Sequence, residues 1–263
     1  MPSVSRLVDV SINTVTRELI LAGEACFDFH DRTVRNVQSK RVQADEIWSF
    51  CQMKEKQARA KMNRPANVGD VWTWTGIDAD SKLLISYFMG SRDADAAMEF
   101  MTALASRLAN RVQLTTDGHH AYLSAVDAAF SRDIDYAMLV KIYGTAPEAE
   151  KRYSPPICLG ADQTVIRGRP DPDHISTSYV ERANLTRMSM RRFTRLTNAF
   201  SKKFENHCHM IALYAFWYNF VRIHKTLRVT PAMQAGIATE LMTLEDAVGL
   251  IDELEAQRSS KSN

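Results

Sequence analysis

The chain has 263 residues, of which 45% are hydrophobic and 24% are charged, a balance typical of a globular protein that excludes a disordered or fibrous chain. The net charge of +2 excludes a uniformly basic protein of the histone kind. No apolar run approaches the roughly 20 residues that cross a bilayer, and the N-terminus lacks a charged segment followed by an apolar core, so we expect a cytoplasmic protein without a membrane segment.

The N-terminal residues 4–29 have a helical pattern, with Ser11 or Asn13 as a possible N-cap. The stretch SINTVTRELILAG is similar to the recognition helix of a helix-turn-helix, a motif that also needs an earlier helix. We therefore expect residues 1–40 to form a partial helix-turn-helix DNA-binding segment and a linker.

From Arg41 the pattern changes to strands and short helices. The runs RVQADEIWSF, VWTWTGIDAD and KLLISYFMG are rich in β-branched and aromatic residues, and a polar turn at residues 78–81 predicts a hairpin between the last two. Helical patterns follow at residues 93–110 and 120–130, and the short strands VQLTT and DYAMLVKIYG come after them. The order βββαβαβ predicts an α/β fold with a mixed sheet covered on both faces, because parallel strands require helical crossovers.

Residues 144–175 break this pattern, since they hold five of the eight prolines and three of the ten glycines. We expect a long irregular connection there. Two helices are predicted after it, at about residues 176–196 and 201–224. The aromatic residues of the second helix are expected in the core rather than in a base-stacking surface.

The sequence of the last part of the chain, residues 236–263, indicates one more helix and a tail. Thr230 and Pro231 predict a short helix just before it. Thr243 with Asp246 forms a capping box for the final helix. The tail QRSSKSN is expected to be disordered.

Residues 182–204 form a basic segment that contains seven cations and no Asp or Glu. Such cations repel each other unless an anionic partner is near. On one helix, Arg187, Arg191 and Arg195 would share a face, and a basic stripe is typical of a nucleic-acid-binding surface; an ordinary solvated face is the alternative. The candidate DNA-binding residues are Arg182, Arg187, Arg191, Arg192, Arg195, Lys202 and Lys203.

Three acidic residues lie where a metal site could form. Asp45 is inside the first strand, where a charge is unfavourable unless a cation or a strong donor binds it. Asp117 ends the fourth strand, and Glu181 lies in the first turns of the helix after the Pro-rich connection. If the first and fourth strands are neighbours, Asp45 and Asp117 meet in space, and the helix can bring Glu181 over them.

Three close carboxylates cannot all stay ionised without cations, so a divalent metal would stabilise them. Oxygen-only ligands suit Mg²⁺ or Mn²⁺, and two such ions about 4 Å apart can drive in-line displacement at phosphorus. Because the basic segment begins one residue after Glu181, the acids and the cations would share a nucleic-acid substrate. We therefore predict Asp45, Asp117 and Glu181 as catalytic, metal-binding residues.

Each acid also has a simpler interpretation. Glu46 points to the opposite side of a pleated strand from Asp45, so only one of the two is expected to face the site. Asp45 is favoured, because Glu46 shares a side with Trp48 and Phe50. The pair Asp117-Gly118 could instead be a plain turn.

Other residues of chemical interest have structural interpretations. Asp78 and Asp80 are typical of a hairpin turn. The four cysteines are dispersed and are expected to be free thiols in a reducing compartment. Cys208 lies between two histidines, but residues two apart on a helix point in nearly opposite directions, which favours a His-rich helix over a zinc site.

The segments RVQADEIWSF, TTDGHHAY and SYVERANLTRMSMRRFTRLTNAFSKK resemble the three catalytic segments of DDE transposases of the insertion-sequence IS1 family. The resemblance extends from about residue 4 to about residue 235 and implies a ribonuclease-H-like DDE domain at 41–235. It implies that Asp45, Asp117 and Glu181 are the metal-binding catalytic triad. It also implies strand cleavage and strand transfer that depend on Mg²⁺ (or Mn²⁺), carried out by a homo-oligomer on the double-stranded DNA of element ends and target.

A later segment, YNFVRIHKTLRVTPAM, looks like the terminal helix and the following phrase of DDE transposases and retroviral-type integrases. This similarity assigns no chemical step to Arg222 or His224. Family members that bind their terminal repeats alone carry a zinc ribbon before a complete helix-turn-helix, and here neither is whole. The interval from Asp117 to Glu181 is also longer than in the shortest members, consistent with an insertion at 144–175. Two alternatives remain: a non-catalytic DNA-binding regulator derived from a transposase, and a ribonuclease-H-like nuclease.

Overall fold

The computed structural model describes residues 1–61, 67–144, 158–188, 190, 192–193 and 199–261, with the side chains of residues 186–188 and 261 outside that description. Its strands are β1 (Arg41–Cys51), β2 (Gly69–Asp78), β3 (Leu84–Gly90), β4 (Val112–Thr116), β5 (Ile134–Tyr143) and β6 (Cys158–Arg167). Its helices are α1 (Pro2–Leu7), α2 (Ile12–Thr33), α3 (Glu55–Arg59), α4 (Ala94–Ala105), α5 (Ala121–Phe130), α6 (Ser178–Met188), α7 (Phe204–Phe216), α8 (Pro231–Gln234) and α9 (Leu244–Lys261). A 3-10 turn at Pro172–His174 and a π-helical turn at Trp217–Val221 are also present.

The strands form one sheet in the order β3-β2-β1-β4-β5-β6. β2 pairs antiparallel with both β1 and β3. β4 pairs parallel with β1, and β5 pairs parallel with β4. This confirms the predicted α/β fold with the ribonuclease-H-like order of elements. It also confirms that the first and fourth strands are neighbours, and in this register Ala44 lies opposite Thr116.

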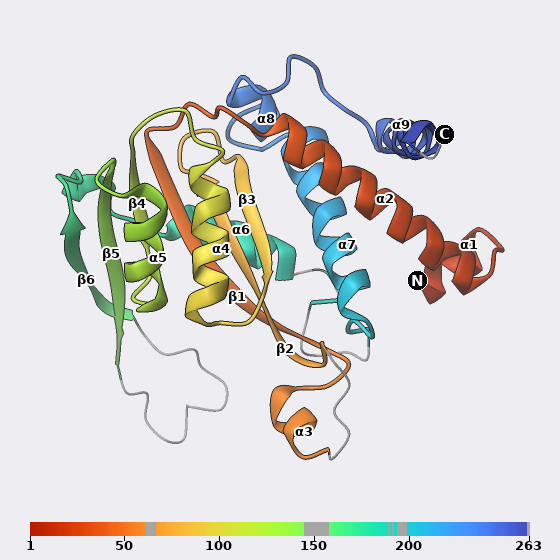
Figure 1. Ribbon diagram of the computed structural model, residues 1–263, viewed down its shortest axis with the longest axis horizontal. Coiled ribbons are helices and arrows are strands. Elements are labelled where there is room, and N and C mark those ends of the chain that lie inside the picture. The colour runs from red at the N-terminus through yellow and green to blue at the C-terminus, as the bar shows by residue number, and fades with distance from the viewer. Residues whose placement is uncertain (62–66, 145–157, 189, 191, 194–198, 262–263) are drawn as a thin grey trace.

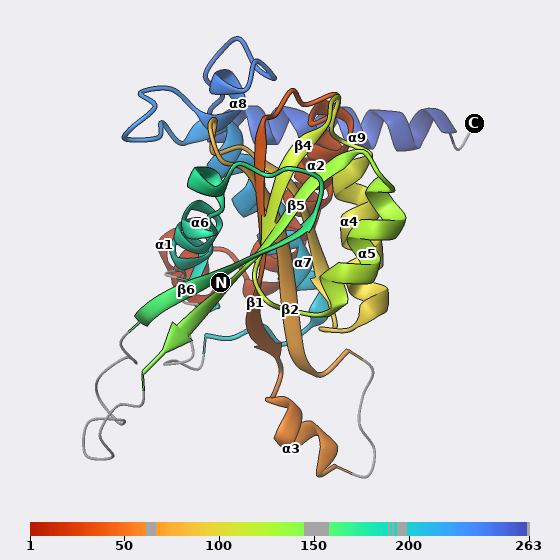
Figure 2. The ribbon, with the colours of Figure 1, turned by 90° about the vertical axis from the view of Figure 1, so that its left-hand side faces the viewer.

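Helices cover both faces of the sheet, as predicted. α4 and α5 lie on one face and α6 on the other (Figure 2), while α2 and α7 pack together beside β3 (Figure 1). The core between the sheet and α4 and α5 is aromatic: Trp74 on β2 contacts Phe100 at 6.0 Å and Tyr122 at 5.4 Å between ring centroids. The strands that carry the acidic residues therefore lie in a sheet with helices on both faces.

The N-terminal helices depart from the expected single helical stretch at 4–29. The chain breaks after α1, and α2 begins at the N-cap Ser11, whose hydroxyl accepts a hydrogen bond from the Thr14 amide. α2 then continues through Gly23 and packs on α7. A Cβ atom at Gly23 would lie 2.3 Å from the Cβ of His209, so the two helices can approach this closely only because residue 23 is glycine.

One strand, β6, lies inside residues 144–175, where an irregular connection was predicted. That prediction was wrong for residues 158–167, which pair antiparallel with β5. The prolines surround this strand without interrupting it, and nearly all of its residues are exposed, so it has no apolar alternation to mark it. Residues 145–157 lie outside the described part of the chain.

The predicted helix at 176–196 is shorter than expected. α6 ends at Met188, and residues 192–193 form a turn. Phe193 is buried and packs edge-on against His207, with ring centroids 4.8 Å apart. Residues 191 and 195 and the side chain of Arg187 lie outside the described part of the chain, so the shared helical face expected for Arg187, Arg191 and Arg195 stays a prediction.

The C-terminal helices agree with expectation in most respects. Phe216 and Phe220 are buried in the core, as predicted for the aromatic helix, and both contact Phe29 of α2. The capping box is present, since the Thr243 amide donates to Asp246 at 2.6 Å and the Asp246 amide donates back to Thr243 at 3.3 Å. The tail predicted to be disordered is helical as far as Lys261, which α9 includes.

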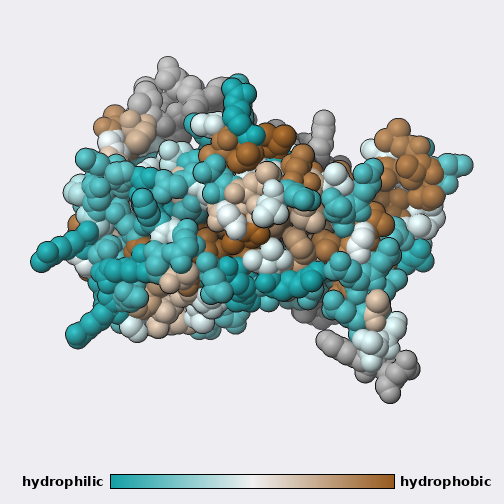
Figure 3. All heavy atoms as spheres, turned by 90° about the horizontal axis from the view of Figure 1, so that it is seen from above, coloured by the Kyte–Doolittle hydropathy of each residue, from teal (hydrophilic) through white to brown (hydrophobic). Residues whose placement is uncertain are grey.

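The face seen in Figure 3 is mostly polar, with separate apolar patches. Exposed apolar side chains occur on α1 and on the β5–β6 hairpin. Within the described ranges, every helix is too short or too polar to span a membrane.

Candidate metal and catalytic site

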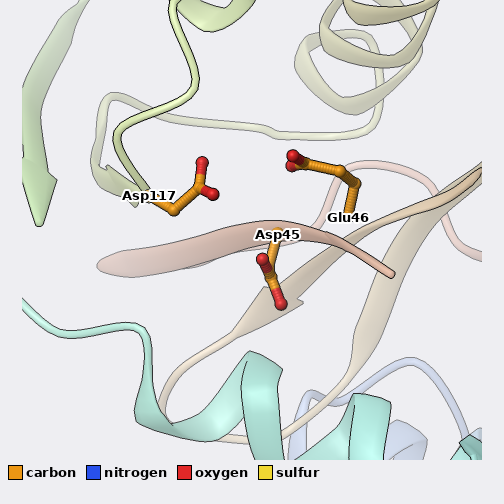
Figure 4. Close-up of side chains that lie close together, drawn as sticks. All are labelled: Asp45, Glu46 and Asp117. Carbon is orange, nitrogen blue, oxygen red and sulfur yellow. The ribbon is translucent and has the colours of Figure 1, made fainter. Parts of the chain in front are cut away.

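Two acidic residues meet because β1 and β4 are parallel neighbours. Ala44 pairs with Thr116, so the next residues along the two strands, Asp45 and Asp117, lie side by side at the end of β4. Among the described residues, one group of possible metal ligands has oxygen atoms that all lie within 4.8 Å of one another: Asp45, Glu46 and Asp117 (Figure 4). The sheet register therefore creates an acidic cluster from residues 72 positions apart in the sequence.

Glu46 belongs to this cluster, which corrects the expectation that only one of the neighbouring acids faces the site. The alternation itself holds: Asp45 points toward the α6 side of β1, and Glu46 points to the other side with Asp117 (Figure 4). Because Asp117 lies beyond the last paired residue of β4, it can approach both sides of β1. At the end of β4, Asp117 can therefore approach acidic side chains on both faces of β1.

The turn after β4 fixes Asp117. Its carboxylate accepts a hydrogen bond from the His119 amide at 3.0 Å, a local turn that holds the side chain in place. A Cβ atom at Gly118 would lie 2.7 Å from Val140 of β5. Glycine therefore allows β5 to pass close to the acid. The same turn places the Asp117 carboxylate in the acidic cluster, and its role in catalysis stays a prediction.

Asp45 is held by a buried amide. The Asn184 side chain of α6 donates to Asp45 at 2.7 Å and accepts from the Thr75 hydroxyl at 3.1 Å. Burial, followed by the negative charge of Asp117, raises the pKa of Asp45 to about 6, whereas the hydrogen bond from Asn184 acts in the opposite direction. Asn184 was not identified from the sequence as a site residue, although it lies three residues after Glu181.

Glu46 is completely buried and strongly paired. Its carboxylate accepts hydrogen bonds from Arg92 at 2.7 Å and from the Tyr122 hydroxyl at 2.8 Å. Burial, followed by the charge of Asp117, raises the pKa of Glu46 to about 7. Arg92 also lies 3.8 Å from Asp117, and its guanidinium stacks 4.6 Å from the ring centroid of Trp72. Nothing in the local sequence around Arg92 indicated this role.

Glu181 reaches the same site from α6. The side chain of Gln43 on β1 caps this helix by accepting hydrogen bonds from the amides of Tyr179 at 2.8 Å and Val180 at 3.2 Å. The Glu181 carboxylate accepts from the Thr177 hydroxyl at 2.6 Å and forms an ion pair with Lys141 of β5. The cap on α6 therefore sets the position of Glu181 relative to β1.

A cavity of about 550 Å³ contains the three predicted acids. Asp45, Asp117 and Glu181 line it together with Arg92, Lys141 and His119. Glu181 lies outside the 4.8 Å cluster, but its charge still raises the pKa of Asp45. The structure thus brings the predicted triad to one cavity and adds Glu46 behind Asp117.

His119 lies at the edge of this cavity against the aromatic core. Its ring faces Trp74 at 5.8 Å between centroids. Burial, followed by the charge of Arg92, lowers the pKa of His119, so the ring is neutral at pH 7. Its Nε2 atom is buried and has no hydrogen-bond partner among the described residues.

The chemistry of the acidic cluster fits a divalent metal ion. All donor atoms are carboxylate oxygens, which suits Mg²⁺ or Mn²⁺. Burial and the nearby charge of Asp117 raise the pKa values of Asp45 and Glu46, and a bound cation would favour their ionised forms. Asp45 and Asp117, with Glu181 across the cavity, are the residues that could hold such an ion.

The predicted DNA-binding cations are only partly described. Arg182, Lys202 and Lys203 are exposed, and Arg192 is half-buried. The ammonium group of Lys202 lies 3.3 Å from the ring centroid of Phe200. The side chain of Arg187, and all of residues 191 and 195, lie outside the described part of the chain.

The aspartates of the β2–β3 turn and the cysteines have the structural roles that were expected of them. Asp78 binds the amide and hydroxyl of Ser81 in the β2–β3 turn, and Asp80 pairs with Arg41. The four cysteines are free thiols. Among the described residues, the one group that could hold a metal contains no cysteine or histidine. His207 instead binds Ser49 and Ser201 through its two ring nitrogens, at 3.2 and 2.9 Å.

No family model and no curated protein matches the chain. Among solved structures, the chain is similar to a pre-cleavage Mos1 transpososome, with 12% identity and a TM-score of 0.23 over 46% of this chain and 42% of that one. It is also similar to a synaptic complex of the piggyBac transposase with hairpin DNA (10%, TM-score 0.33, 81% of this chain and 52% of that one) and to the Mos1 strand transfer complex (13%, TM-score 0.26, 81% and 70%). The chain spans about half the length of the first two. Membership of the IS1 family stays a prediction.

Proposed function

We propose that the chain is a DDE transposase that cleaves and transfers DNA strands at insertion-sequence ends in a reaction that depends on Mg²⁺ or Mn²⁺. The observation that supports this most is the convergence of Asp45, Asp117 and Glu181 on one cavity from three separate segments of the chain. A protein that needed only affinity for DNA would gain nothing from carboxylates that repel phosphate.

The acidic residues would act as a pair of metal sites. Asp45 and Asp117, with Glu181 on the facing helix, would hold two ions. The chemistry that these ions supply when bound is activation of a water or 3′-hydroxyl and stabilisation of the leaving oxygen. Asn184 favours the ionised form of Asp45, and Thr177 with Lys141 fixes the Glu181 carboxylate.

Arg92 would keep the inner part of the site neutral. Its guanidinium pairs with Glu46, whose side chain is fully buried, and also lies near Asp117. A buried carboxylate without such a partner is strongly unfavourable. Arg92 thereby leaves the outer oxygens of Asp117, whose side chain is 35% exposed, available to a ligand in the cavity.

The DNA itself would contact the basic segment that starts at Arg182. Arg182, Lys202 and Lys203 are exposed and able to meet phosphates. We further propose that residues 1–40 contribute a partial helix-turn-helix, that residues 41–235 form the catalytic domain, and that the protein acts as a homo-oligomer on DNA. Residues 236–263 form the C-terminal segment that contains α9.

The test is a cleavage assay with purified protein and Mg²⁺ on linear DNA. One DNA carries the terminal repeats of the element and the other carries a scrambled sequence. The wild type is compared with Asp117→Asn, which keeps the size of the side chain but removes its charge. Nicking of the repeat DNA alone, lost in the variant, is the expected result.

The other outcomes identify the alternatives. Cleavage of both DNAs by the wild type, again lost in Asp117→Asn, would indicate a general nuclease. Salt-sensitive binding without cleavage by either protein would indicate a regulator. Cleavage that persists in Asp117→Asn would show that the acidic cavity is not the active site.

A further inference from the structure

A second cavity, of about 270 Å³, lies on the other side of α6 and is basic. Four residues with cationic or protonatable side chains line it: Lys82, Arg182, Arg222 and His224. They come from the β2–β3 turn, from α6 and from the segment after the π-helical turn. Arg222 and His224 belong to the segment YNFVRIHKTLRVTPAM, whose similarity to transposases assigned no chemical step to either residue.

Helical periodicity separates the two cavities. Successive residues turn by 100° on a helix, so Tyr179, Arg182 and Ala183 share one side of α6, while Glu181 lies on the opposite side. The observed linings follow this rule, because the first three residues line the basic cavity and Glu181 lines the acidic one. α6 therefore contributes an acidic side chain, Glu181, to one cavity and a basic side chain, Arg182, to the other.

Aromatic rings hold two of the cations in place. The ammonium group of Lys82 lies 3.0 Å from the ring centroid of Tyr179, and the guanidinium of Arg222 lies 5.3 Å from that of Trp217. Such contacts attract a cation without neutralising its charge. The positive ends are thus oriented but still able to bind an anion.

The described lining of this cavity holds more cations than acids. Lys82, Arg182 and Arg222 line it with one acid, Asp80, which pairs with Arg41 and, together with Asp78, also attracts Lys82. Burial lowers the pKa of His224, and the charges of Arg222, Lys82 and Arg182 lower it further. The Nδ1 atom of His224 is also buried without a hydrogen-bond partner in the described part of the chain. The cavity therefore concentrates positive potential that an anion would relieve.

We propose that this basic cavity binds a backbone phosphate of the DNA strand whose scissile bond lies in the acidic cavity. The proposal rests on the function proposed above and adds a second contact point for its substrate. A helix with its side chains is about 10–12 Å across, and phosphates of one strand follow each other by about 3.4 Å along a duplex. A strand that crosses α6 would place the bound phosphate about three nucleotides from the scissile one.

The experiment measures DNA binding without metal, so that it does not depend on cleavage. Fluorescence anisotropy of a labelled duplex of about 30 base pairs, long enough to span both cavities, is recorded in EDTA over a series of salt concentrations. The test variants are Lys82→Gln and Arg222→Gln, and Arg222→Lys keeps the charge. Arg132→Gln is the control, because Arg132 is an exposed cation that lines neither cavity. Thermal unfolding establishes that each variant is folded.

Loss of one phosphate contact should lower the slope of log affinity against log salt by about 0.9 and reduce the affinity ratio between 50 and 200 mM salt about threefold. We expect this change for Lys82→Gln and Arg222→Gln, but not for Arg222→Lys or Arg132→Gln. Slopes equal to that of the wild type in both Gln variants would overturn the proposal. If the slopes change but the wild type never cleaves DNA, the phosphate site stands and the transposase function fails. If the wild type cleaves DNA but the slopes do not change, the transposase function stands and the phosphate site fails.

Discussion

The two sides of α6 differ in charge although they are separated by a single helix. Toward β1 and β4, the helix contributes Glu181 to a cavity that also contains Asp45 and Asp117. Toward the β2–β3 turn, it contributes Arg182 to a cavity that contains Lys82 and Arg222. The difference arises because each side faces different elements, so one short helix contributes to an acidic cavity and to a basic one. Under the proposals above, the first cavity would carry out phosphate chemistry and the second would bind a phosphate.

Removal of the acid that α6 contributes should have the largest effect. Glu181→Gln should lower the single-turnover rate of DNA cleavage by about 10³-fold, because a lost metal ligand removes several kcal/mol of transition-state stabilisation. DNA binding in EDTA should not weaken, because the variant removes a negative charge that repels phosphate. Glu205→Gln is the control, since Glu205 also lies in the first turn of a helix but lines neither cavity. Equal cleavage rates for Glu181→Gln and the wild type would show that α6 takes no part in the cleavage reaction.

A second variant tests the amide that α6 directs toward Asp45. Asn184→Ala should cost about 1–3 kcal/mol of stability, because it leaves buried polar partners unsatisfied. It should also move the acid limb of the pH–rate profile to higher pH, since the hydrogen bond from Asn184 favours ionised Asp45. Cleavage at pH 7 then falls.

The control for Asn184 is Asn219, a buried amide that binds the backbone of Leu84 away from both cavities. Asn219→Ala should cost similar stability in thermal unfolding but leave the acid limb in place. If both variants shift the pH–rate profile equally, Asn184 acts only through stability.

A third test concerns Glu46, the acid that lies behind Asp117. Its pKa is about 7 in the folded chain against an ordinary value of 4.5, so the folded state binds a proton more tightly than the unfolded state. This contribution to stability is therefore full below about pH 4.5 and is lost as the pH rises through 7. Glu46→Gln should remove this loss, which is on the order of 2–3 kcal/mol. The measurement is chemical denaturation in EDTA from about pH 4.5 to about pH 8, and parallel curves for the two proteins would contradict it.

The smallest expected effect is on the basic side of α6. Asp80→Asn removes the acid that lines the basic cavity, so it should tighten DNA binding by no more than about threefold at low salt. Asp127→Asn, on the exposed face of α5, should leave binding unchanged. Weaker binding by Asp80→Asn would show that the positive potential of this cavity is not what contacts DNA.

Local patterns predicted the sheet and the acidic cavity well. The βββαβαβ order was predicted, and Asp45 and Asp117 were expected to meet if the first and fourth strands are neighbours, as β1 and β4 are. The capping box at Thr243 and the N-cap at Ser11 were also readable, because each depends on residues three positions apart. In all these cases the controlling contact is short-range or follows from strand order.

Long-range partners could not be predicted in this way. Arg92 reaches the acids from just after β3, Lys141 from β5 and Asn184 from α6, and no spacing in the sequence encodes such contacts. Glu46 was set aside because strand side chains alternate. The alternation holds, but Asp117 lies beyond the last paired residue of β4 and meets Glu46 on the other face of β1. β6 was not predicted because prolines surround it in the sequence, although its own ten residues contain none.

The most direct test of the central claim is Mn²⁺ binding, measured by electron paramagnetic resonance on the metal-free protein. We predict that the wild type binds Mn²⁺, that Asp45→Asn and Asp117→Asn each lose this binding, and that Asp127→Asn, which changes an exposed acid on α5, retains it. Equal Mn²⁺ binding by all four proteins, or none by the wild type, would contradict the claim that the acids of β1 and β4 form a metal site.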